Sequence, residues 1–323
     1  MPEERKVRVG VLGVGYMGAN HARILSSMPG VELVGAADSR AEKAVEVAEK
    51  YGGAAFSEPG ELIESVEALI VAVPTELHHQ YALQALQAGL DVLVEKPITD
   101  SLERADELIS AAGKTGRILQ VGHVERYNPV CLELPRLVEQ PVLFTCERLS
   151  PYIPSWVGNT GVVLDLMIHD LDVVLGLVDS GVERLEAFGR AIRSETEDLA
   201  AATVSFEGGA LAVFVSSRVS QTKVRRITVT QPGEYISADL LRQNIAVHHF
   251  VSSDYFFDER MGFKQETVTE IPYLSRHGEP LRLELEAFLE SVVTRKPPLV
   301  GGAEGRLALA LALAVMEKAG LSR

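Results

Sequence analysis

The sequence lacks the features that mark several protein classes. Its two cysteines, Cys131 and Cys146, do not have the short spacing of a metal-binding or redox pair. They are expected to stay reduced, which fits a cytoplasmic protein. The longest uncharged apolar run, residues 307–316, is too short to cross a bilayer. The charged opening Met-Pro-Glu-Glu-Arg-Lys leads directly into an apolar strand, so we expect no signal peptide.

Basic residues are also scarce, with 31 Lys and Arg against 45 Asp and Glu, for a formal net charge of -14. This field repels polyanions, so nucleic acids and anionic membranes are not expected as partners. A small anionic substrate stays possible because a local cluster of basic side chains can outweigh the global charge. At 323 residues and 46% hydrophobic, the chain is long enough for two globular domains.

The strongest local pattern lies near the amino terminus. Residues 6–12 predict a buried parallel strand, which leads through Gly13-x-Gly15-x-x-Gly18 into a helix over residues 19–28. In this context the glycines permit a tight turn, approach of a pyrophosphate to the backbone, and close packing of helix on strand. The phosphates would bind at the helix start. The alternative is a glycine-rich turn that binds nothing.

A second predicted strand, residues 31–37, ends at Asp38, where a carboxylate binds the ribose hydroxyls of NAD. Because a carboxylate repels a 2′-phosphate, Asp38 favours NAD, while the nearby Arg40 leaves NADP as an alternative. The cofactor-binding residues expected from this region are Gly13, Gly15, Tyr16, Met17, Gly18, Asp38 and Arg40.

The order of predicted elements divides the chain. Strands over residues 54–57, 68–73, 91–94 and 117–121 alternate with helices over 40–51, 76–89 and 101–113. This alternation predicts a doubly wound parallel sheet of the Rossmann type in residues 1–123. Later strands are expected at 142–149, 183–192, 200–206, 211–217, 225–230, 235–240 and 245–250. Hairpin turns and a helix over 162–178 make residues 124–301 an α+β domain with a large, open, mostly antiparallel sheet.

Such a sheet needs cover on both faces. We expect the helix over 162–178 to cover one face. The other face would form the interface of a homodimer or homotetramer, since a bare sheet of this size is an apolar liability.

Two motifs follow parallel strands at the edge where ligands bind in open α/β sheets. Lys96, within Glu95-Lys96-Pro97, is positioned to stabilise negative charge on a substrate hydroxyl that loses hydride. The alternative is a surface lysine. Thr75 and His78, after Pro74, are expected to line the nicotinamide ribose, or else to form a helix cap. Five residues of these motifs complete the expected cofactor site: Pro74, Thr75, His78, Glu95 and Lys96.

A third constellation consists of Asp165, His169 and Asp172. With α-helical periodicity the three share one face of an otherwise apolar helix. Polar groups on a buried helix are costly unless they partner one another or face a site. A histidine held by a carboxylate is suited to act as a general base. A structural His–Asp pair and a metal site are the alternatives, and no further ligand spacing supports the metal.

Substrate contacts are expected where the chain passes from one predicted domain to the next, since clefts form there. Four polar or aromatic residues lie in this stretch: His123, Arg126, Tyr127 and Asn128. Arg126 is the best candidate to bind an anionic group of the substrate. Asp172 is also expected to contact the substrate.

Taken together, Gly13-x-Gly15-x-x-Gly18, Thr75-x-x-His78, Glu95-Lys96-Pro97 and Asp165-x-x-x-His169 resemble the glucose–fructose oxidoreductase, inositol dehydrogenase and rhizopine catabolism (Gfo/Idh/MocA) family. The resemblance covers essentially the whole chain. It implies an NAD(P)-dependent sugar oxidoreductase with Lys96, Asp165 and His169 as catalytic residues. It also implies that the last helix, residues 302–323, packs back on the nucleotide-binding domain.

Residues 121–129 and 162–170 resemble a narrower subgroup, which oxidises the 3-hydroxyl of UDP-N-acetylglucosamine or of its uronate. The subgroup has an arginine between positions 151 and 161, where this chain has Ser155 and Trp156 and no basic residue. Two alternatives to a UDP-amino sugar dehydrogenase are a dehydrogenase of a free polyol or sugar, such as myo-inositol or glucose, and a non-catalytic sugar-sensing regulator.

Overall fold

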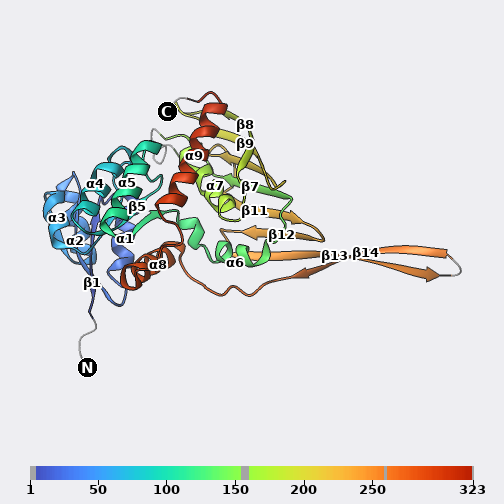
Figure 1. The fold of residues 1–323 in the computed structure, drawn as a ribbon, viewed down its shortest axis with the longest axis horizontal. Helices are drawn as coiled ribbons and strands as arrows, with labels where there is room; N and C mark the ends of the chain where they lie inside the picture. The colour runs from blue at the N-terminus through green and yellow to red at the C-terminus, as the bar shows by residue number, and fades with distance from the viewer. Residues whose placement is uncertain (1–4, 154–159, 258–259, 322–323) are drawn as a thin grey trace. The chain divides into compact units, whose positions relative to one another are not determined.

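A computed structural model describes residues 5–153, 160–257 and 260–321 (Figure 1). The chain forms two compact units, which are described separately. Unit 1 consists of Met1–Tyr127 with Gly278–Ala310, and unit 2 of Asn128–His277 with Leu311–Arg323. The sequence-based boundaries had placed residues 278–301 in the second domain. The structure groups them with unit 1 because α8 (Pro280–Thr294) buries Leu281, Leu285 and Phe288 in the same core as β1 and β2.

Unit 1 contains a six-stranded parallel sheet in the order β3-β2-β1-β4-β5-β6. The strands are β1 Val7–Leu12, β2 Val31–Ala37, β3 Ala54–Phe56, β4 Ala68–Val71, β5 Asp91–Glu95 and β6 Leu119–Gly122. The strand order reverses between β1 and β4, which creates the crevice where doubly wound folds bind ligands. The predicted Rossmann-type sheet is confirmed.

Helices connect these strands and cover the sheet. They are α1 Tyr16–Leu25, α2 Ala41–Tyr51, α3 Pro59–Ser65, α4 Thr75–Gln87 and α5 Leu102–Thr115, followed by the 3-10 turn η1 Val124–Tyr127. All four residues of β4 are fully buried, as expected for a parallel strand covered on both faces. The short α3 was not predicted, because it buries only Leu62 and Ile63 and shows no helical periodicity in the sequence.

The last helix, α9 (Gly302–Lys318), begins in unit 1 and ends in unit 2. Its first turn lies very close to the Rossmann-type sheet. A Cβ atom on Gly305 would come within 2.6 Å of Val121 Cγ2, and one on Gly302 within 2.7 Å of Ile109 Cγ1. Residues 302–310 therefore pack on β6 and α5.

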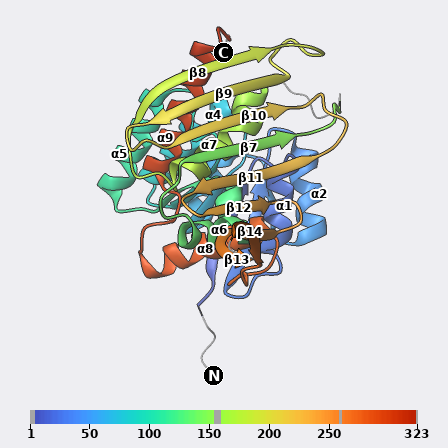
Figure 2. The ribbon, with the colours of Figure 1, turned by 90° about the vertical axis from the view of Figure 1, so that its right-hand side faces the viewer.

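Unit 2 contains an eight-stranded sheet in the order β14-β13-β12-β11-β7-β10-β9-β8 (Figure 2). The strands are β7 Leu143–Leu149, β8 Val182–Arg190, β9 Leu199–Phe206, β10 Leu211–Ser217, β11 Val224–Gln231, β12 Glu234–Asp239, β13 Asn244–Phe257 and β14 Arg260–Glu270. Every pair is antiparallel except β7 with β10. The mostly antiparallel sheet is confirmed. The unit also contains α6 (Pro129–Leu137), which was not predicted.

One face of this sheet is covered by a helix, but the helix differs from the one predicted over 162–178. It begins as a π-helical turn, η3 (Val163–Met167), and continues as α7 (Ile168–Leu175). These segments contact β7 and β10. Because the helix covers one face, the burial of side chains alternates along β7. Phe144, Cys146 and Arg148 are buried, and their neighbours are half-buried.

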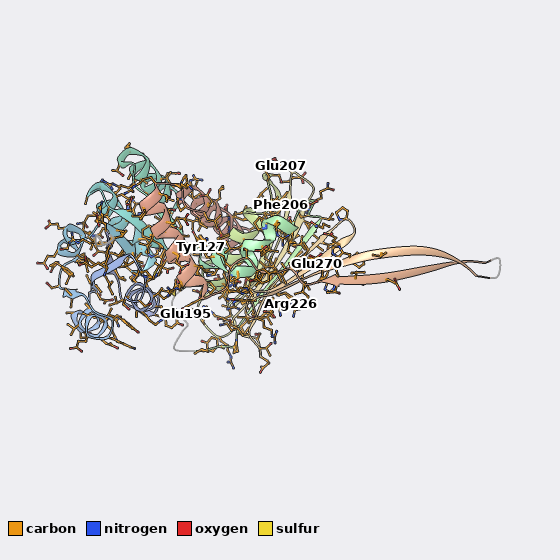
Figure 3. The ribbon with its side chains drawn as sticks, turned by 90° about the horizontal axis from the view of Figure 1, so that it is seen from below. Tyr127, Glu195, Phe206, Glu207, Arg226 and Glu270 are labelled. Atoms are coloured by element: carbon orange, nitrogen blue, oxygen red, sulfur yellow. The ribbon has the colours of Figure 1, made fainter. Side chains whose placement is uncertain are left out.

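Strands β13 and β14 extend beyond the sheet. β12 pairs only with residues 244–249 of β13, whereas β13 and β14 pair with each other out to Phe257 and Arg260. The two strands therefore continue as a two-stranded ribbon (Figures 1 and 3), and Glu270 marks the end of β14 in Figure 3. The sequence analysis predicted β13 only to residue 250 and did not predict β14.

Candidate functional site

The three glycines of the first turn have different reasons to be glycine. Gly13 has a φ of 85°, and a Cβ there would lie 2.6 Å from the Ala72 carbonyl oxygen. A Cβ on Gly18 would overlap the carbonyl oxygen of Gly13. Gly15 differs, because a Cβ there would meet no atom within 4 Å. The fold itself requires Gly13 and Gly18, whereas the open space at Gly15 suits a ligand that approaches the backbone.

The start of α1 fits that ligand. Gly15 is its N-cap residue, and no side chain caps the helix. The first N–H groups of a helix have no intrahelical partner, and the helix dipole favours negative charge there. The chain's own residues therefore fit the pyrophosphate of a dinucleotide. Of the flanking residues in the predicted set, Tyr16 is exposed and Met17 is half-buried against the core.

We expect Gly15→Ala to fold normally and to lose affinity for NAD by about tenfold or more, because the added methyl group would occupy the space of the pyrophosphate. Thermal unfolding and calorimetric titration with NAD measure the two effects. Gly60→Ala is the matched control, since a Cβ at Gly60 also meets nothing within 4 Å. Unchanged NAD affinity in Gly15→Ala would remove the glycine loop from the cofactor site.

Asp38 supports this loop from the end of β2. Its Oδ2 accepts a hydrogen bond from the Val14 N–H at 2.8 Å, and its Oδ1 accepts one from the Arg40 N–H at 3.0 Å. The Arg40 Nε lies 3.6 Å from the same Oδ1. The structure thus places a carboxylate beside the loop, as predicted for an NAD-binding protein, with a guanidinium close enough to offset part of its charge.

Replacing Asp38 with glycine should raise the affinity for NADP relative to NAD by about tenfold or more, because a carboxylate facing a 2′-phosphate is repulsive. The ratio of the two dissociation constants is the measurement, since loss of the Val14 contact weakens both equally. Glu42→Gln removes an exposed carboxylate from the first turn of α2 and controls for the general field. An unchanged ratio would mean that Asp38 does not face the ribose.

Lys96 follows β5 directly and is half-buried. Pro74 occupies the N-cap position of α4 without a side-chain hydrogen bond, and Thr75 is the first residue of that helix. His78 is buried, with Nδ1 2.8 Å from the Pro97 carbonyl oxygen and Nε2 2.9 Å from that of Val73. Burial lowers the pKa of His78, and the ring lies between the segments that follow β4 and β5. Its predicted contact with the nicotinamide ribose stays a prediction.

His123 directly follows β6 and is fully buried. Burial and the positive charges of Lys96 and Arg126 lower its pKa to about 3. The imidazole is therefore neutral at physiological pH and can donate or accept a hydrogen bond without carrying charge. In the same turn, Arg126 is half-buried and Tyr127 is buried.

The structure gives Asn128 a structural position. Its Oδ1 accepts from the Val130 N–H at 3.2 Å and caps α6, and its Nδ2 donates to the Leu240 carbonyl at 3.0 Å. Asparagine is among the preferred N-cap residues, and Asn128 has this role at the start of α6. The predicted role in substrate binding rested on position in the sequence alone.

Asp165, His169 and Asp172 lie in unit 2, on η3 and α7. Asp165 and His169 are half-buried and Asp172 is buried. The predicted helix is not a continuous α-helix here, because Asp165 lies within the π turn η3 while His169 and Asp172 lie on α7. That the three side chains share one face stays a prediction. Turns of the π type are frequent at functional sites.

Two buried ion pairs that the sequence analysis missed support this helix. The first joins α7 to β7. Arg148 donates to both carboxylate oxygens of Asp170, from Nε at 3.0 Å and from Nη2 at 2.6 Å, and both side chains are 3% exposed. Alternation along β7 places Arg148 on the buried face, which is the one sequence signal for it.

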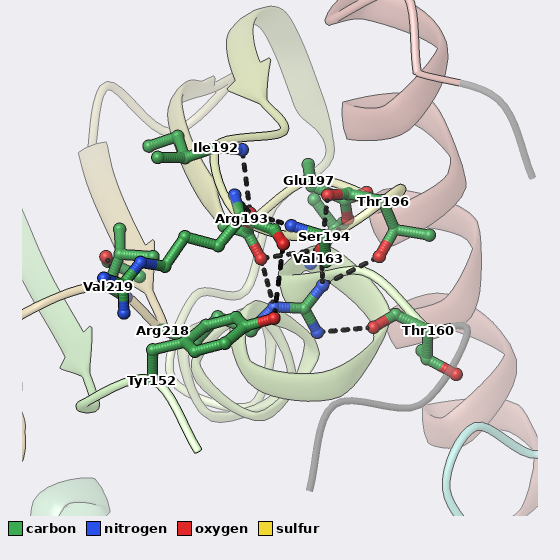
Figure 4. A network of polar contacts seen from close by, with 12 residues as sticks. Tyr152, Thr160, Val163, Ile192, Arg193, Ser194, Thr196, Glu197, Arg218 and Val219 are labelled. Atoms are coloured by element: carbon green, nitrogen blue, oxygen red, sulfur yellow. Dashed lines mark hydrogen bonds and ion pairs between the residues drawn. The ribbon is translucent and has the colours of Figure 1, made fainter. Parts of the chain in front are cut away.

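The second pair holds the residues just before η3 (Figure 4). Arg218 donates to Asp198 Oδ1 at 2.7 Å and to the Thr160 carbonyl at 2.8 Å. The Val163 N–H donates to Glu197 Oε1 at 3.0 Å. Burial opposes ionisation of Asp198, but the Arg193 N–H and the Arg218 guanidinium outweigh it and hold its pKa well below the usual value. The network fixes the start of the helix that carries Asp165 and His169.

Ser155 and Trp156 lie outside the described residues. Among the residues that are described, no three His, Cys, Asp or Glu side chains are grouped to hold a metal ion, and no helix there is long and apolar enough to cross a bilayer. A pocket of about 660 Å³ in unit 1 is lined by residues including Val7, Glu67, Asp91 and Arg117. It lies at the amino ends of β1, β4 and β5, opposite the edge that carries the glycine loop and Lys96.

The doubly wound sheet, the open position at Gly15 and Asp38 at the end of β2 fit a dinucleotide-binding protein of the Rossmann type. Residues 7–123 match the model of an oxidoreductase family with an NAD-binding Rossmann fold, and residues 140–231 match the GFO/IDH/MocA C-terminal domain. The chain belongs to the Gfo/Idh/MocA family, and its cofactor is NAD.

Several relatives cover nearly the whole chain. It is 33% identical to a UDP-N-acetylglucosamine 3-dehydrogenase of Acidithiobacillus ferrooxidans, covering 96% of each protein. It is 27% identical to a scyllo-inositol 2-dehydrogenase (NAD(+)) of Bacillus subtilis, covering 96% of this chain and 93% of that protein. A solved structure of the Acidithiobacillus enzyme superimposes with a TM-score of 0.87 at 32% identity, covering 97% of each chain.

Proposed function

We propose that this protein oxidises the 3-hydroxyl of a UDP-amino sugar, either UDP-N-acetylglucosamine or its uronate, to a 3-keto sugar. The observation that carries the proposal is the similarity to a UDP-N-acetylglucosamine 3-dehydrogenase along 96% of both chains. The motifs at residues 121–129 and 162–170 agree with it. NAD, when bound, supplies the acceptor for the hydride, and NADP is the alternative that Arg40 permits.

We assign the catalytic work to Lys96, His169 and Asp165. The Lys96 ammonium donates a hydrogen bond to the reacting hydroxyl oxygen and stabilises the negative charge that develops there. An imidazole nitrogen of His169 accepts the hydroxyl proton as general base. Asp165 favours the protonated imidazole that results, by its charge. Arg126 binds an anionic part of the substrate, and His123, Tyr127, Asn128 and Asp172 complete the proposed substrate set.

The test is reduction of NAD on mixing the loaded protein, in parallel, with UDP-N-acetylglucosamine, its uronate, myo-inositol and glucose. Absorbance must be followed with one-turnover sensitivity, because a 3-keto product held in the site stops the reaction after one cycle. A burst with a UDP-sugar alone supports the proposal. A burst only with the free polyol or sugar overturns the substrate and leaves the cofactor and catalytic residues as assigned.

The second candidate is a dehydrogenase of a free polyol. Two observations favour it, namely the similarity to a scyllo-inositol 2-dehydrogenase and the lack of a basic residue in 151–161. The match to an oxidoreductase family and the presence of Lys96, Asp165 and His169 argue against a non-catalytic sensor.

We further propose that the chain forms a homodimer or homotetramer through the face of the unit 2 sheet opposite η3 and α7. Val213 on β10 lies between Thr145 on β7 and Thr203 on β9, and Thr228 continues this row on β11. All four lie on the face opposite the buried side chains of these strands. Small β-branched side chains on a broad face suit packing against a second sheet.

Light scattering should therefore give more than one chain per particle for the wild type and a single chain for Val213→Lys, because a charge in a packed sheet interface is left without a partner. Val45→Lys places the same charge on the exposed surface of α2 and should change nothing. A wild-type monomer would overturn the proposal.

A further inference from the structure

A buried cluster of titratable groups lies directly behind Lys96. Glu95, the last residue of β5, is 7% exposed. Its Oε1 accepts a hydrogen bond from His21 Nε2 at 2.7 Å, and its Oε2 accepts one from the Lys96 N–H at 3.2 Å. His21 is fully buried on α1. Gly122 on β6 permits this arrangement, since a Cβ there would lie 3.0 Å from Glu95 Oε2.

A second carboxyl group, Glu284 on α8, is fully buried in the same unit. In the described part of the chain neither of its carboxyl oxygens has a hydrogen-bond partner. Its backbone carbonyl accepts from Gln120 Nε2 at 3.3 Å. Burial and the negative charge of Glu95 raise the pKa of Glu284 well above the usual value, which favours its neutral form.

The charge of Glu95 is set by groups from every element around it. Burial opposes its ionisation, but the hydrogen bond from His21 and the charges of His21, Lys96 and His78 outweigh it and lower the pKa of Glu95. These groups come from α1, from the residue after β5, and from α4, while Glu284 faces it from α8. These surroundings thus favour one carboxylate and one neutral acid in the cluster.

The stability of the fold does not explain why His21, Glu95 and Glu284 are buried together. A buried ion pair is often replaced by apolar side chains without loss of stability, and a buried carboxyl without hydrogen bonds destabilises the fold. Buried groups with shifted pKa values gather at functional sites. Here the pair joins α1, whose first turn fits the NAD pyrophosphate, to the residue that precedes Lys96.

We propose that His21 and Glu95 form a positioning pair that couples the NAD-binding start of α1 to Lys96, and that Glu284 stays protonated so that Glu95 carries the one negative charge of the cluster. The inference rests on the catalytic role proposed for Lys96. A second ionised carboxyl would pull the Lys96 ammonium toward the interior, away from a substrate oxygen.

Three variants test the pair. His21→Asn and Glu95→Gln should each lower the single-turnover rate by about tenfold to about a hundredfold, the scale of a small misplacement of a reacting group. For His21→Asn, calorimetry should show an NAD dissociation constant within about threefold of the wild type, since the loop and Asp38 are intact. The double variant His21→Leu, Glu95→Met should regain thermal stability over either single variant, while its rate stays low. Recovery of the rate with stability would reduce the pair to a structural role and overturn the proposal.

Glu284 is tested without reference to activity. The pKa of Glu284 is higher in the folded than in the unfolded protein. The folded protein therefore has its full stability below the unfolded-state pKa of this group, and loses stability as the pH rises toward the folded-state pKa. Glutamine has no proton to lose. The melting temperature of Glu284→Gln should therefore exceed that of the wild type by a gap that widens from about pH 5 to about pH 9. Glu290→Gln, exposed on the same helix, should show no such gap.

A difference in melting temperature that is absent, or that does not change with pH, would overturn the proposal that Glu284 stays protonated. If no sugar reduces NAD with the wild type, the proposed function fails, but the melting curves still report on the cluster. If a UDP-sugar reacts and the His21 and Glu95 variants keep the wild-type rate, the positioning pair fails alone.

Discussion

Lys96→Met should lower hydride transfer by more than about a hundredfold, the scale of one positioned charge-stabilising group. Methionine has a similar volume but no charge and no N–H donor, so the substrate oxygen would develop negative charge without a partner. NAD affinity should stay close to that of the wild type, because the glycine loop and Asp38 lie on β1, α1 and β2. Single-turnover absorbance and calorimetric titration measure the two quantities.

The control for this variant is Lys114→Met, which removes an exposed lysine from the last turn of α5. It should match the wild type in both measurements. An active Lys96→Met enzyme would refute the role assigned to Lys96 and, with it, the coupling through Glu95.

Asp170→Asn should lower the free energy of unfolding by about 3–5 kcal/mol, the cost of leaving a buried charge without its partner. Arg148 and Asp170 are each 3% exposed, so water cannot replace the lost carboxylate. Denaturant titration measures the change. Replacing both residues, as Arg148→Met with Asp170→Leu, should recover most of the loss, because apolar side chains of similar volume fill the same space.

A matched pair on the surface provides the contrast. Arg282 and Glu286 form an i,i+4 ion pair at 3.0 Å with both side chains 40% exposed. Breaking it as Glu286→Gln should cost no more than about 0.5 kcal/mol, the worth of an exposed helix pair. A loss below about 1 kcal/mol for Asp170→Asn would mean that Arg148 finds another partner.

The Arg148–Asp170 pair also bears on the reaction, since Asp170 is the neighbour of His169. A variant that keeps the fold but loosens α7 should move His169 and lower the transfer rate. The double variant Arg148→Met, Asp170→Leu separates the loss of stability from the loss of transfer rate. It restores packing of α7 on β7 without the bidentate contact between Arg148 and Asp170.

Helices and strands were predicted well where a single hydrophobic periodicity or a single turn motif determines the local structure. β2 was predicted at residues 31–37 and lies there, because the segment is apolar apart from the exposed Glu32 and ends in three buried residues. The helix predicted from residue 101 begins at Leu102, and Ser101 is its N-cap, whose side chain accepts a hydrogen bond from the Arg104 N–H. The π turn at η3 was not predicted, because one extra residue per turn leaves the apolar pattern of a buried helix almost unchanged.

The sequence by itself determined the parallel sheet, the antiparallel sheet, the glycine loop with Asp38, and Lys96 at the end of a strand. Each of these depends on residues close together in the chain, where periodicity and turn chemistry act. Only the tertiary structure decided that α8 joins unit 1, that Asp170 pairs with Arg148, and that His21 holds Glu95 with Glu284 nearby. The physical reason is that burial and charge pairing join residues up to hundreds of positions apart, and no local pattern records which buried charges meet.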